Sequence, residues 1–279
     1  MQAKTLAKRE ELCSSLPVRI TILGSGSEGN SLLLDTGKTR LLVDAGLSYR
    51  RLVKRFEALG RTPPVDVSAV LVTHGHADHA SHASTYAARL HCPVRATEHT
   101  MKGLRLREST ATEAFPVGRT FHIGDIAIHA RAIPHDAHQV ALRFESRSGC
   151  IALVTDLGHV PKGLARFLDG CDSLLLESNH DEDMLANGPY PAALKRRVGG
   201  PLGHLSNAQA GDLLADLAHN PSEVVLMHLS ETNNSADMAR CSAEAALGHG
   251  PTRLRIAQQR EPTELGAAQE RQLQLGLYG

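Results

Sequence analysis

The sequence predicts one α/β domain with mostly buried strands over residues 17–260. Short apolar runs recur along this stretch, segments with helical patterning lie between them, and no linker rich in Pro, Gly and Ser divides it. A chain of 279 residues is long enough to bury a large core. The polar segments 1–16 and 261–279 are expected to form an N-terminal arm and a C-terminal tail outside this domain.

The first half of the domain predicts a β-hairpin followed by alternating helices and strands. VRITIL is expected to be a strand, and the apolar runs in NSLLLDTG and TRLLVDAG flank a turn, as in a hairpin. SYRRLVKRFEALG is amphipathic and predicts a helix that ends at Gly60. VSAVLVT predicts a buried strand, a helix is expected from Ser81 to about Leu90, and CPVRAT predicts a short strand.

The second half continues the same alternation. Strands are expected at IAIHARAI, VALRFES and CIALVTD, and at SLLLES after the short helix PKGLARFL. Ser206 is a good N-cap for a helix over NAQAGDLLADLAH, and EVVLMHL predicts the strand that follows.

Three glycines near the N-terminus have the spacing of a dinucleotide-binding turn, and Asp44 lies where an acid could meet a ribose. These are Gly24, Gly26 and Gly29. A helix of about a dozen residues must follow such glycines so that its N-terminus faces the pyrophosphate. Strands are predicted there instead, so we reject a dinucleotide site. The GKT at residues 37–39 is not a P-loop either, because Leu32 stands where a glycine is needed.

Composition narrows the class of protein. Lys+Arg and Asp+Glu are both 30, so no global field favours nucleic acid or membrane, although a local basic patch can still act. The five cysteines form no CxxC pair, which argues against a zinc ribbon or a disulfide framework and favours reduced thiols in a cytoplasmic protein. No signal peptide and no membrane-spanning run is predicted.

The segment VLVTHGHADHASH predicts a metal site. His74 and His76 follow a buried strand two residues apart, so both imidazoles can bind one cation. Asp78 and His79, on the turn into the next helix, would face a second cation beside it.

Other predicted strands also end in metal-ligand residues. RAIPHDAHQ offers either His135 or His138, ALVTDLG offers Asp156, and VVLMHLS offers His228, while His204 comes directly before a helix. Strand ends that meet at one edge of a sheet would bring these side chains together. The sequence therefore predicts a metal centre built from several strands.

This pattern resembles the metallo-β-lactamase fold superfamily over roughly residues 17–260. HxHxDH with a later His, Asp and His carries the resemblance, and LGSGSEGNS, LLVDAGLS, ESNHD, GHLSN and HLSETNN are similar to its YycJ (WalJ) group. The resemblance implies a four-layer αββα sandwich that holds two divalent cations, Zn²⁺ or Mn²⁺. It also implies a phosphodiesterase that attacks with a metal-bridging hydroxide, and 5′-to-3′ exonuclease action on double-stranded DNA.

The resemblance also implies roles for single residues. One metal would be held by His74, His76 and His135, and the other by Asp78, His79 and His228, with Asp156 bridging. Asp44 would hydrogen-bond a ligand imidazole. The catalytic residues would be Asp78 and His204, the latter donating a proton to the leaving oxygen unless it is only a supporting or helix-cap residue.

Possible substrate-binding residues are less specific. His180 could line the cleft or only hydrogen-bond Glu177, and the basic run LKRRVGG is as typical of a solvated helix face as of a phosphate site. The residues that could contact substrate are His180, Lys195, Arg196, Arg197 and Ser206.

Two other functions fit the residues. A small-molecule hydrolase for a cyclic phosphodiester or thioester would have a closed pocket and rates insensitive to salt, whereas nuclease activity should fall steeply as salt rises. A non-catalytic metal-binding or regulatory module would lack ligands, and none of the pattern is missing. The sequence predicts neither oligomeric state nor pathway.

Overall fold

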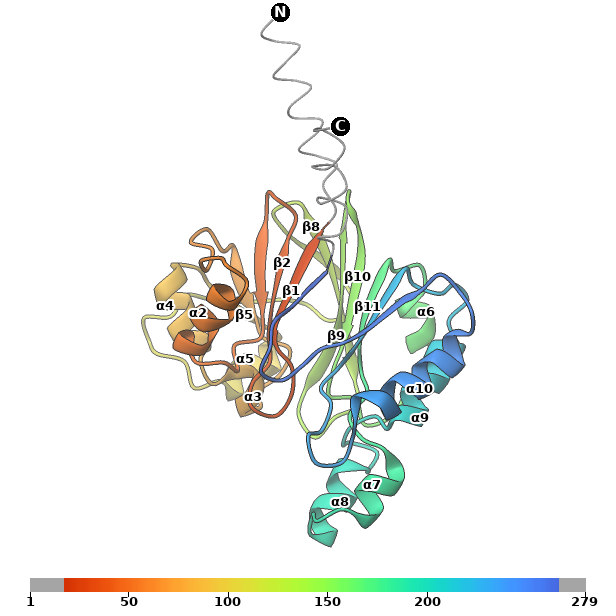
Figure 1. Cartoon of the computed structure of the whole chain (residues 1–279). Coiled ribbons are helices and arrows are strands. Elements are labelled where there is room, and N and C mark those ends of the chain that lie inside the picture. The colour runs from red at the N-terminus through yellow and green to blue at the C-terminus, as the bar shows by residue number, and fades with distance from the viewer. Residues whose placement is uncertain (1–17, 266–279) are drawn as a thin grey trace, which may run out of the picture.

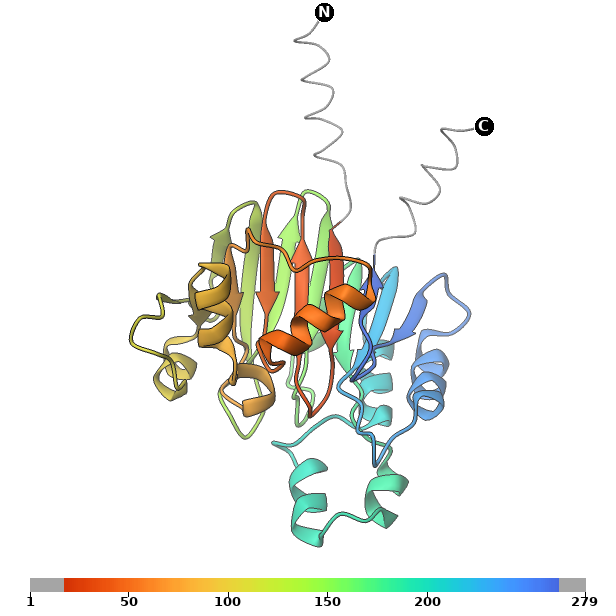
Figure 2. The ribbon, with the colours of Figure 1, turned by 60° about the vertical axis from the view of Figure 1, so that its left-hand side comes forward.

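Two seven-stranded mixed β-sheets lie face to face, with helices on both outer faces, in the computed structural model of the chain (Figures 1 and 2). The structure describes residues 18–265, so the arm expected at 1–16 and most of the expected tail lie outside the described residues. The four-layer αββα arrangement that the resemblance implies is confirmed. None of the helices in residues 18–265 is long and apolar enough to cross a membrane.

The N-terminal sheet contains the predicted hairpin, and the strands that come next along the chain are parallel to the second strand of that hairpin. Its order is β14 (Thr263–Leu265), β1 (Arg19–Gly24), β2 (Ser31–Asp35), β3 (Arg40–Val43), β4 (Ala69–Leu71), β5 (Val94–Ala96) and β6 (Thr112–Ala114). The helices of this half are α2 (Tyr49–Ala58), α3 (Ala77–Ala80), α4 (Ala83–Leu90) and α5 (Glu98–Gly103).

The second sheet contains most of the remaining chain. Its order is β13 (Arg253–Ile256), β12 (Glu223–Met227), β11 (Ser173–Glu177), β10 (Gly149–Val154), β9 (Gln139–Ser146), β8 (Ile126–Ile133) and β7 (Thr120–Ile123). Its outer face is covered by α6 (Leu164–Leu168), α9 (Asn207–Ala215) and α10 (Ala236–Leu247), while α7 (Glu182–Asn187) and α8 (Ala192–Val198) project beyond the sandwich (Figure 1).

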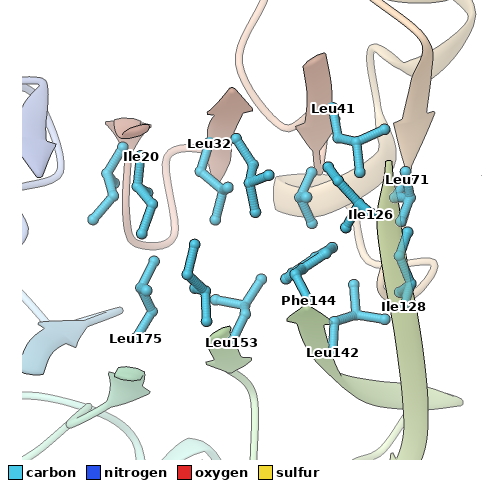
Figure 3. Packing of buried hydrophobic residues seen from close by; sticks show 14 of the residues in the cluster. Ile20, Leu32, Leu41, Leu71, Ile126, Ile128, Leu142, Phe144, Leu153 and Leu175 are labelled. Carbon is cyan, nitrogen blue, oxygen red and sulfur yellow. The ribbon is translucent and has the colours of Figure 1, made fainter. Parts of the chain in front are cut away.

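Three hydrophobic clusters correspond to the three contacts between the four layers. The central one fills the space between the sheets, where Leu32 and Leu41 of one sheet face Leu153 and Phe144 of the other (Figure 3). The other two clusters lie under the outer helices. Strands buried on both faces explain why their sequences are continuous apolar runs without alternation.

The elements predicted from apolar runs are present, with two differences. The helix expected from Ser81 is preceded by the short helix α3, and β14 joins the sheet beyond residue 260, where we expected the domain to end. Strand β2 follows the three glycines directly, as the rejection of a dinucleotide site requires.

Cys150 and Cys171 are free thiols, although their Sγ atoms lie 3.0 Å apart.

The loop that carries HxHxDH is held against the loops after β1 and β3 by backbone hydrogen bonds. The amide of Asn30 donates to the Asp78 carbonyl at 2.7 Å, and the amide of Ala45 donates to the His79 carbonyl at 2.6 Å. Gly46 fits between them: a Cβ there would lie 1.7 Å from the Asp78 carbonyl oxygen and 2.7 Å from the Asn30 amide. Only glycine allows the backbones to approach this closely. The contact fixes the position of Asp78 and His79 relative to the loops after β1 and β3.

We expect Gly46→Ala to destabilise the protein by roughly 3 kcal/mol, since backbone on both sides must shift to admit the methyl group. The midpoint of thermal unfolding should fall by about 6–12 °C. Gly103→Ala is the matched control, because its Cβ would meet nothing within 4 Å. Equal midpoints for the two variants would show that the loops can separate without cost.

Candidate metal centre

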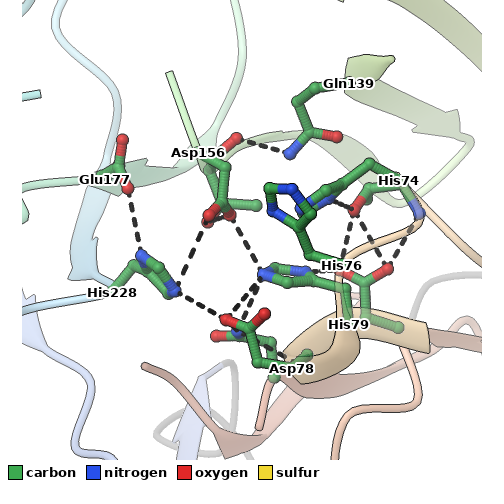
Figure 4. A network of polar contacts seen from close by, with 12 residues as sticks. His74, His76, Asp78, His79, Gln139, Asp156, Glu177 and His228 are labelled. Carbon is green, nitrogen blue, oxygen red and sulfur yellow. Dashed lines mark hydrogen bonds and ion pairs between the residues drawn. The ribbon is translucent and has the colours of Figure 1, made fainter. Parts of the chain in front are cut away.

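All seven residues predicted to bind metal lie together at one edge of the sandwich, and Figure 4 labels all of them except His135. Each comes from the end of an element. His74 and His76 follow β4, while Asp78 and His79 lie in α3; the others follow β8, β10 and β12, and are His135, Asp156 and His228. Four strands from two sheets therefore converge on this edge.

One group of imidazoles is formed by His74, His76 and His135, whose ligand-type atoms lie within 4.8 Å of one another. Nε2 of His135 lies 3.2 Å from Nδ1 of His76. His74 and His135 are buried, and His76 is half-buried at the cleft. Three imidazole nitrogens at this spacing form a donor set typical of Zn²⁺.

A second group is formed by Asp78, His79 and His228, again within 4.8 Å. Nε2 of His79 lies 3.6 Å from Oδ2 of Asp78, and Nε2 of His228 lies 3.5 Å from the same oxygen. Asp156 lies between the groups, with Oδ2 3.1 Å from His79 Nε2 and Oδ1 4.0 Å from His135 Nε2.

The nitrogen of each buried imidazole that faces away from the centre is held by a neighbour. Oδ2 of Asp44 lies 2.7 Å from His79 Nδ1, and the same carboxylate accepts hydrogen bonds from the amide and hydroxyl of Thr73. Nδ1 of His135 donates to the Gly203 carbonyl at 3.0 Å, since a carbonyl can only accept. Partners of this kind fix ring orientation and tautomer, so Nε2 is the atom of each ring that remains to bind a cation.

Among the imidazoles of the two donor groups, two buried nitrogens have no hydrogen-bond partner in the described residues. They are Nε2 of His74 and Nε2 of His228, and both face the centre. A buried polar atom without a partner costs free energy, so native proteins rarely leave one unsatisfied. Together with a donor set of imidazoles and carboxylates, these atoms fit bound divalent cations.

Three residues of the centre have a left-handed backbone conformation that side chains other than glycine rarely adopt. They are Asp44 at φ 61°, Asp156 at φ 55° and His228 at φ 57°, each just after a strand. Such conformations persist where the surrounding structure enforces them, and they cluster at functional sites. Here the turn directs each side chain inward at the point where its strand ends.

The charges of the centre stabilise one another. Burial alone would raise the pKa of Asp156, but the imidazoles of His228 and His79 hold it well below its usual value. Burial would likewise lower the pKa of His79, yet Asp156 and Asp44 raise it well above normal. The carboxylate is thus held ionised, as a metal ligand must be.

Glu177 is a functional residue that the sequence analysis did not assign to the site. Its Oε1 lies 2.8 Å from Nδ1 of His204 and 3.1 Å from Nδ1 of His228, and the carboxylate is fully buried. Burial lowers the pKa of His204, but Glu177 outweighs it and the pKa is raised. An acid at the end of the apolar run SLLLE was the available signal, of the same kind that identified Asp156.

Two further residues of the site were not predicted. Nδ2 of Asn30, in the glycine-rich loop, lies 2.8 Å from Nε2 of His79. Oδ1 of Asp136 lies 3.1 Å from Nε2 of His76 and 3.3 Å from Nε2 of His135. Asn30 lies in the LGSGSEGNS stretch and Asp136 directly follows His135, but the sequence analysis gave neither residue a role.

The structure separates the expected substrate-binding residues into two sets. His180 and Ser206 are 2% and 1% exposed, and neither lines the cleft; Ser206 Oγ instead caps α9 and donates to Glu182. His180 has no hydrogen bond to Glu177, and its Nδ1 is without a partner among the described residues. The structure therefore places these two residues outside the lining of the cleft.

The basic run lies on α8, beside the cleft. Arg197 lines the cleft and donates to Asp136 at 2.8 Å, while Arg196 is exposed to solvent. Lys195 donates to the Ala186 carbonyl.

The choice between His135 and His138 has a clear geometric outcome. The ring of His138 packs against His99, with centroids 3.2 Å apart, and lines a separate cavity of about 500 Å³. Among the described residues, the group that includes His74 and His76 is completed by His135.

Solved structures share this architecture. The metallo-β-lactamase fold protein YhfI from Bacillus subtilis matches with a TM-score of 0.67 and 19% identity over 89% of this chain and 100% of that one. Zn²⁺-bound PqqB from Methylobacterium extorquens matches with a TM-score of 0.66 and 19% identity over 88% and 99%. The fold and the His/Asp clusters thus define a divalent-metal protein of the metallo-β-lactamase fold.

Sequence comparison gives the family within this fold. A family model described as the beta-lactamase superfamily domain matches residues 39–229. Exodeoxyribonuclease WalJ of Streptococcus pneumoniae is 34% identical over 250 residues, which cover 85% of this chain and 93% of WalJ. Exodeoxyribonuclease YycJ of Bacillus anthracis is 35% identical over 239 residues, covering 82% and 89%. The chain therefore belongs to the WalJ/YycJ group of the β-lactamase superfamily.

We expect His135→Ala to lower the bound zinc from about two ions per chain to about one, because it removes one of three imidazoles from its group. His138→Ala is the matched control and should keep both ions. Metal content after loading and gel filtration, measured by plasma mass spectrometry, checks this. Loss of zinc from His138→Ala alone would transfer the ligand role to that residue.

Proposed function

We propose that the protein is a dinuclear metal-dependent phosphodiesterase that degrades double-stranded DNA from its 5′ ends. The observation that carries the proposal is the convergence of four strand ends on two adjoining donor groups. The exodeoxyribonuclease names of the two relatives support DNA as the substrate. We also infer that it acts in the cytoplasm, where reduced thiols and duplex DNA occur together.

The donor groups support a specific assignment of ligands. One cation would be held by His74, His76 and His135, and the other by Asp78, His79 and His228, while Asp156 could contribute its carboxylate to either group. Imidazole-rich groups favour Zn²⁺, while the carboxylates also suit Mn²⁺. Either cation would lower the pKa of water and offset charge on a phosphate.

The chain's own residues complete the chemistry. His204 lies at the cleft with its Nδ1 held by Glu177, which leaves Nε2 as the nitrogen that can face a substrate. The raised pKa favours the protonated ring, so His204 can donate a proton to the oxygen that leaves phosphorus. Asp44 and Glu177 act through the imidazoles that they orient.

The charge of α8 supports a nucleic-acid substrate. Arg196 is exposed, and Arg197 lines the cleft beside the proposed metal site. Cations placed there attract the phosphate backbone without reading base sequence.

His76→Ala should abolish DNA hydrolysis and reduce bound metal, whereas His204→Ala should keep both ions and lose about 10²–10⁴-fold in rate. Parallel metal analysis and a nuclease assay measure the two effects. If His204→Ala emptied a metal site, its role as proton donor would be wrong.

Blocking the 5′ ends of a labelled duplex should stop its degradation, and blocking the 3′ ends should not. The assay uses bulky end blocks with Mn²⁺ and, separately, with Zn²⁺. Degradation that ignored the 5′ block would exclude the polarity, and a rate independent of salt would favour a small-molecule substrate.

A further inference from the structure

The segment that contains α7 and α8 forms one side of the cleft. These helices project from the same end of the sandwich as α3, and both views show them apart from the helices that cover the sheets (Figures 1 and 2). No residue of α8 is buried, so the helix contributes little to the core. The position of α8 is therefore explained better by the residues that it presents to the cleft than by packing in the core.

The side of α8 that faces the cleft is largely apolar. Leu194 and Val198 are four residues apart and therefore share one face of the helix, and Tyr190 lies just before it. All three are half-exposed and line the cleft. We call Tyr190, Leu194 and Val198 the apolar wall.

The cleft has two chemically different sides. Besides the apolar wall, its lining includes imidazoles and carboxylates of the metal centre, and its volume is about 260 Å³. A matching ligand carries a phosphate at one end and an apolar, flat group at the other. This volume is at or below the range typical of small-molecule sites, so it suits one nucleotide unit rather than several.

The apolar wall is fixed to the metal centre by an ion pair. Arg197 of α8 donates to Oδ2 of Asp136 at 2.8 Å, while Oδ1 of the same carboxylate lies 3.1 Å from His76. The arginine side chain is 62% exposed, so the pair is weak in isolation. It joins α8 to a carboxylate that also contacts the proposed ligand His76.

We propose that the apolar wall receives the base of the terminal nucleotide while the metal centre holds the adjoining phosphate. The inference rests on the proposed function and assigns a base-binding subsite to it. Tyr190 supplies the flat face on which a base stacks, a contact that tolerates any base because every base has a π-face. Leu194 and Val198 extend that surface toward the metal centre.

This subsite explains why such an enzyme would act on ends. A cleft of about 260 Å³ has room for a single nucleotide that leaves the stack but not for a base pair. An end nucleotide leaves the stack more readily than an internal one, because it has a neighbour on one side only. Cleavage would then follow unstacking of one nucleotide at a time.

The first test measures binding without turnover. Metal-loaded protein is titrated by calorimetry with deoxyadenosine 3′,5′-bisphosphate and with its abasic counterpart, 1,2-dideoxyribose 3,5-bisphosphate. The base should tighten binding by about tenfold or more, as base–aromatic stacking does. Tyr190→Ala should remove that difference, Tyr190→Phe should keep it, and Leu202→Ala, an exposed residue of the same segment outside the cleft, should leave it unchanged.

Failure of the subsite and failure of the nuclease proposal give different results. If the protein degrades DNA but binds both bisphosphates equally, or if Tyr190→Ala keeps the preference for the base, the subsite is wrong and the nuclease proposal stands. If the base preference is present and depends on Tyr190 but no DNA is degraded, the subsite stands and the substrate is another nucleotide.

The second test uses the end of the duplex itself. Duplexes that differ only in a matched or mismatched terminal pair should differ about tenfold in kcat/KM, with the mismatch faster, because unstacking a paired end opposes entry. Tyr190→Ala should raise KM about tenfold with little change in kcat. Equal rates on both ends would exclude entry of an unstacked nucleotide.

Discussion

The buried carboxylate of Asp156 is the constraint on which the rest of the site depends. At 1% exposure it cannot be solvated by water, so its charge must be compensated by protein groups or by bound cations. The imidazoles of His79 and His228 approach it from the two sheets, at 3.1 and 3.8 Å. A fold that brings imidazoles to a carboxylate in this way supplies a donor set that fits divalent cations.

Motifs and apolar runs within single segments of the sequence predicted the ligand residues of the metal centre. HxHxDH is contiguous, so only a strand and the turn after it had to be recognised to predict His74, His76, Asp78 and His79. Asp156 and His228 were found because each ends an apolar run. The order of the two seven-stranded sheets could not be read from those runs, because pairing between distant strands leaves no periodic trace.

The contacts that hold the centre in place were less visible. Asn30 and Asp136 reach the imidazoles through loops whose path depends on tertiary packing, and Glu177 was read as part of a strand. His180 and Ser206 are the converse case: they were predicted as possible substrate contacts because they are polar and lie near a motif, and the structure buries both. A residue type near a motif indicates chemistry, but only the fold decides which way the side chain points.

The apolar wall adds a size and shape filter to a centre that otherwise only holds phosphate. Leu194 and Val198 lie on α8, and Tyr190 lies just before it. The sequence analysis predicted no helix there, since α8 is short and buries none of its residues. A protein with the same sandwich but a different segment in place of α7 and α8 would bind a different substrate next to the cations. Substrate choice is thereby separated from the hydrolytic chemistry.

The most direct measurement is anomalous X-ray scattering from crystals soaked in Mn²⁺ or Zn²⁺. The account predicts two neighbouring peaks, one among the imidazoles of His74, His76 and His135 and one beside His79 and His228, with Asp156 touching both. Soaked crystals with no peak at this edge of the sandwich, and with the imidazoles turned apart, would contradict it.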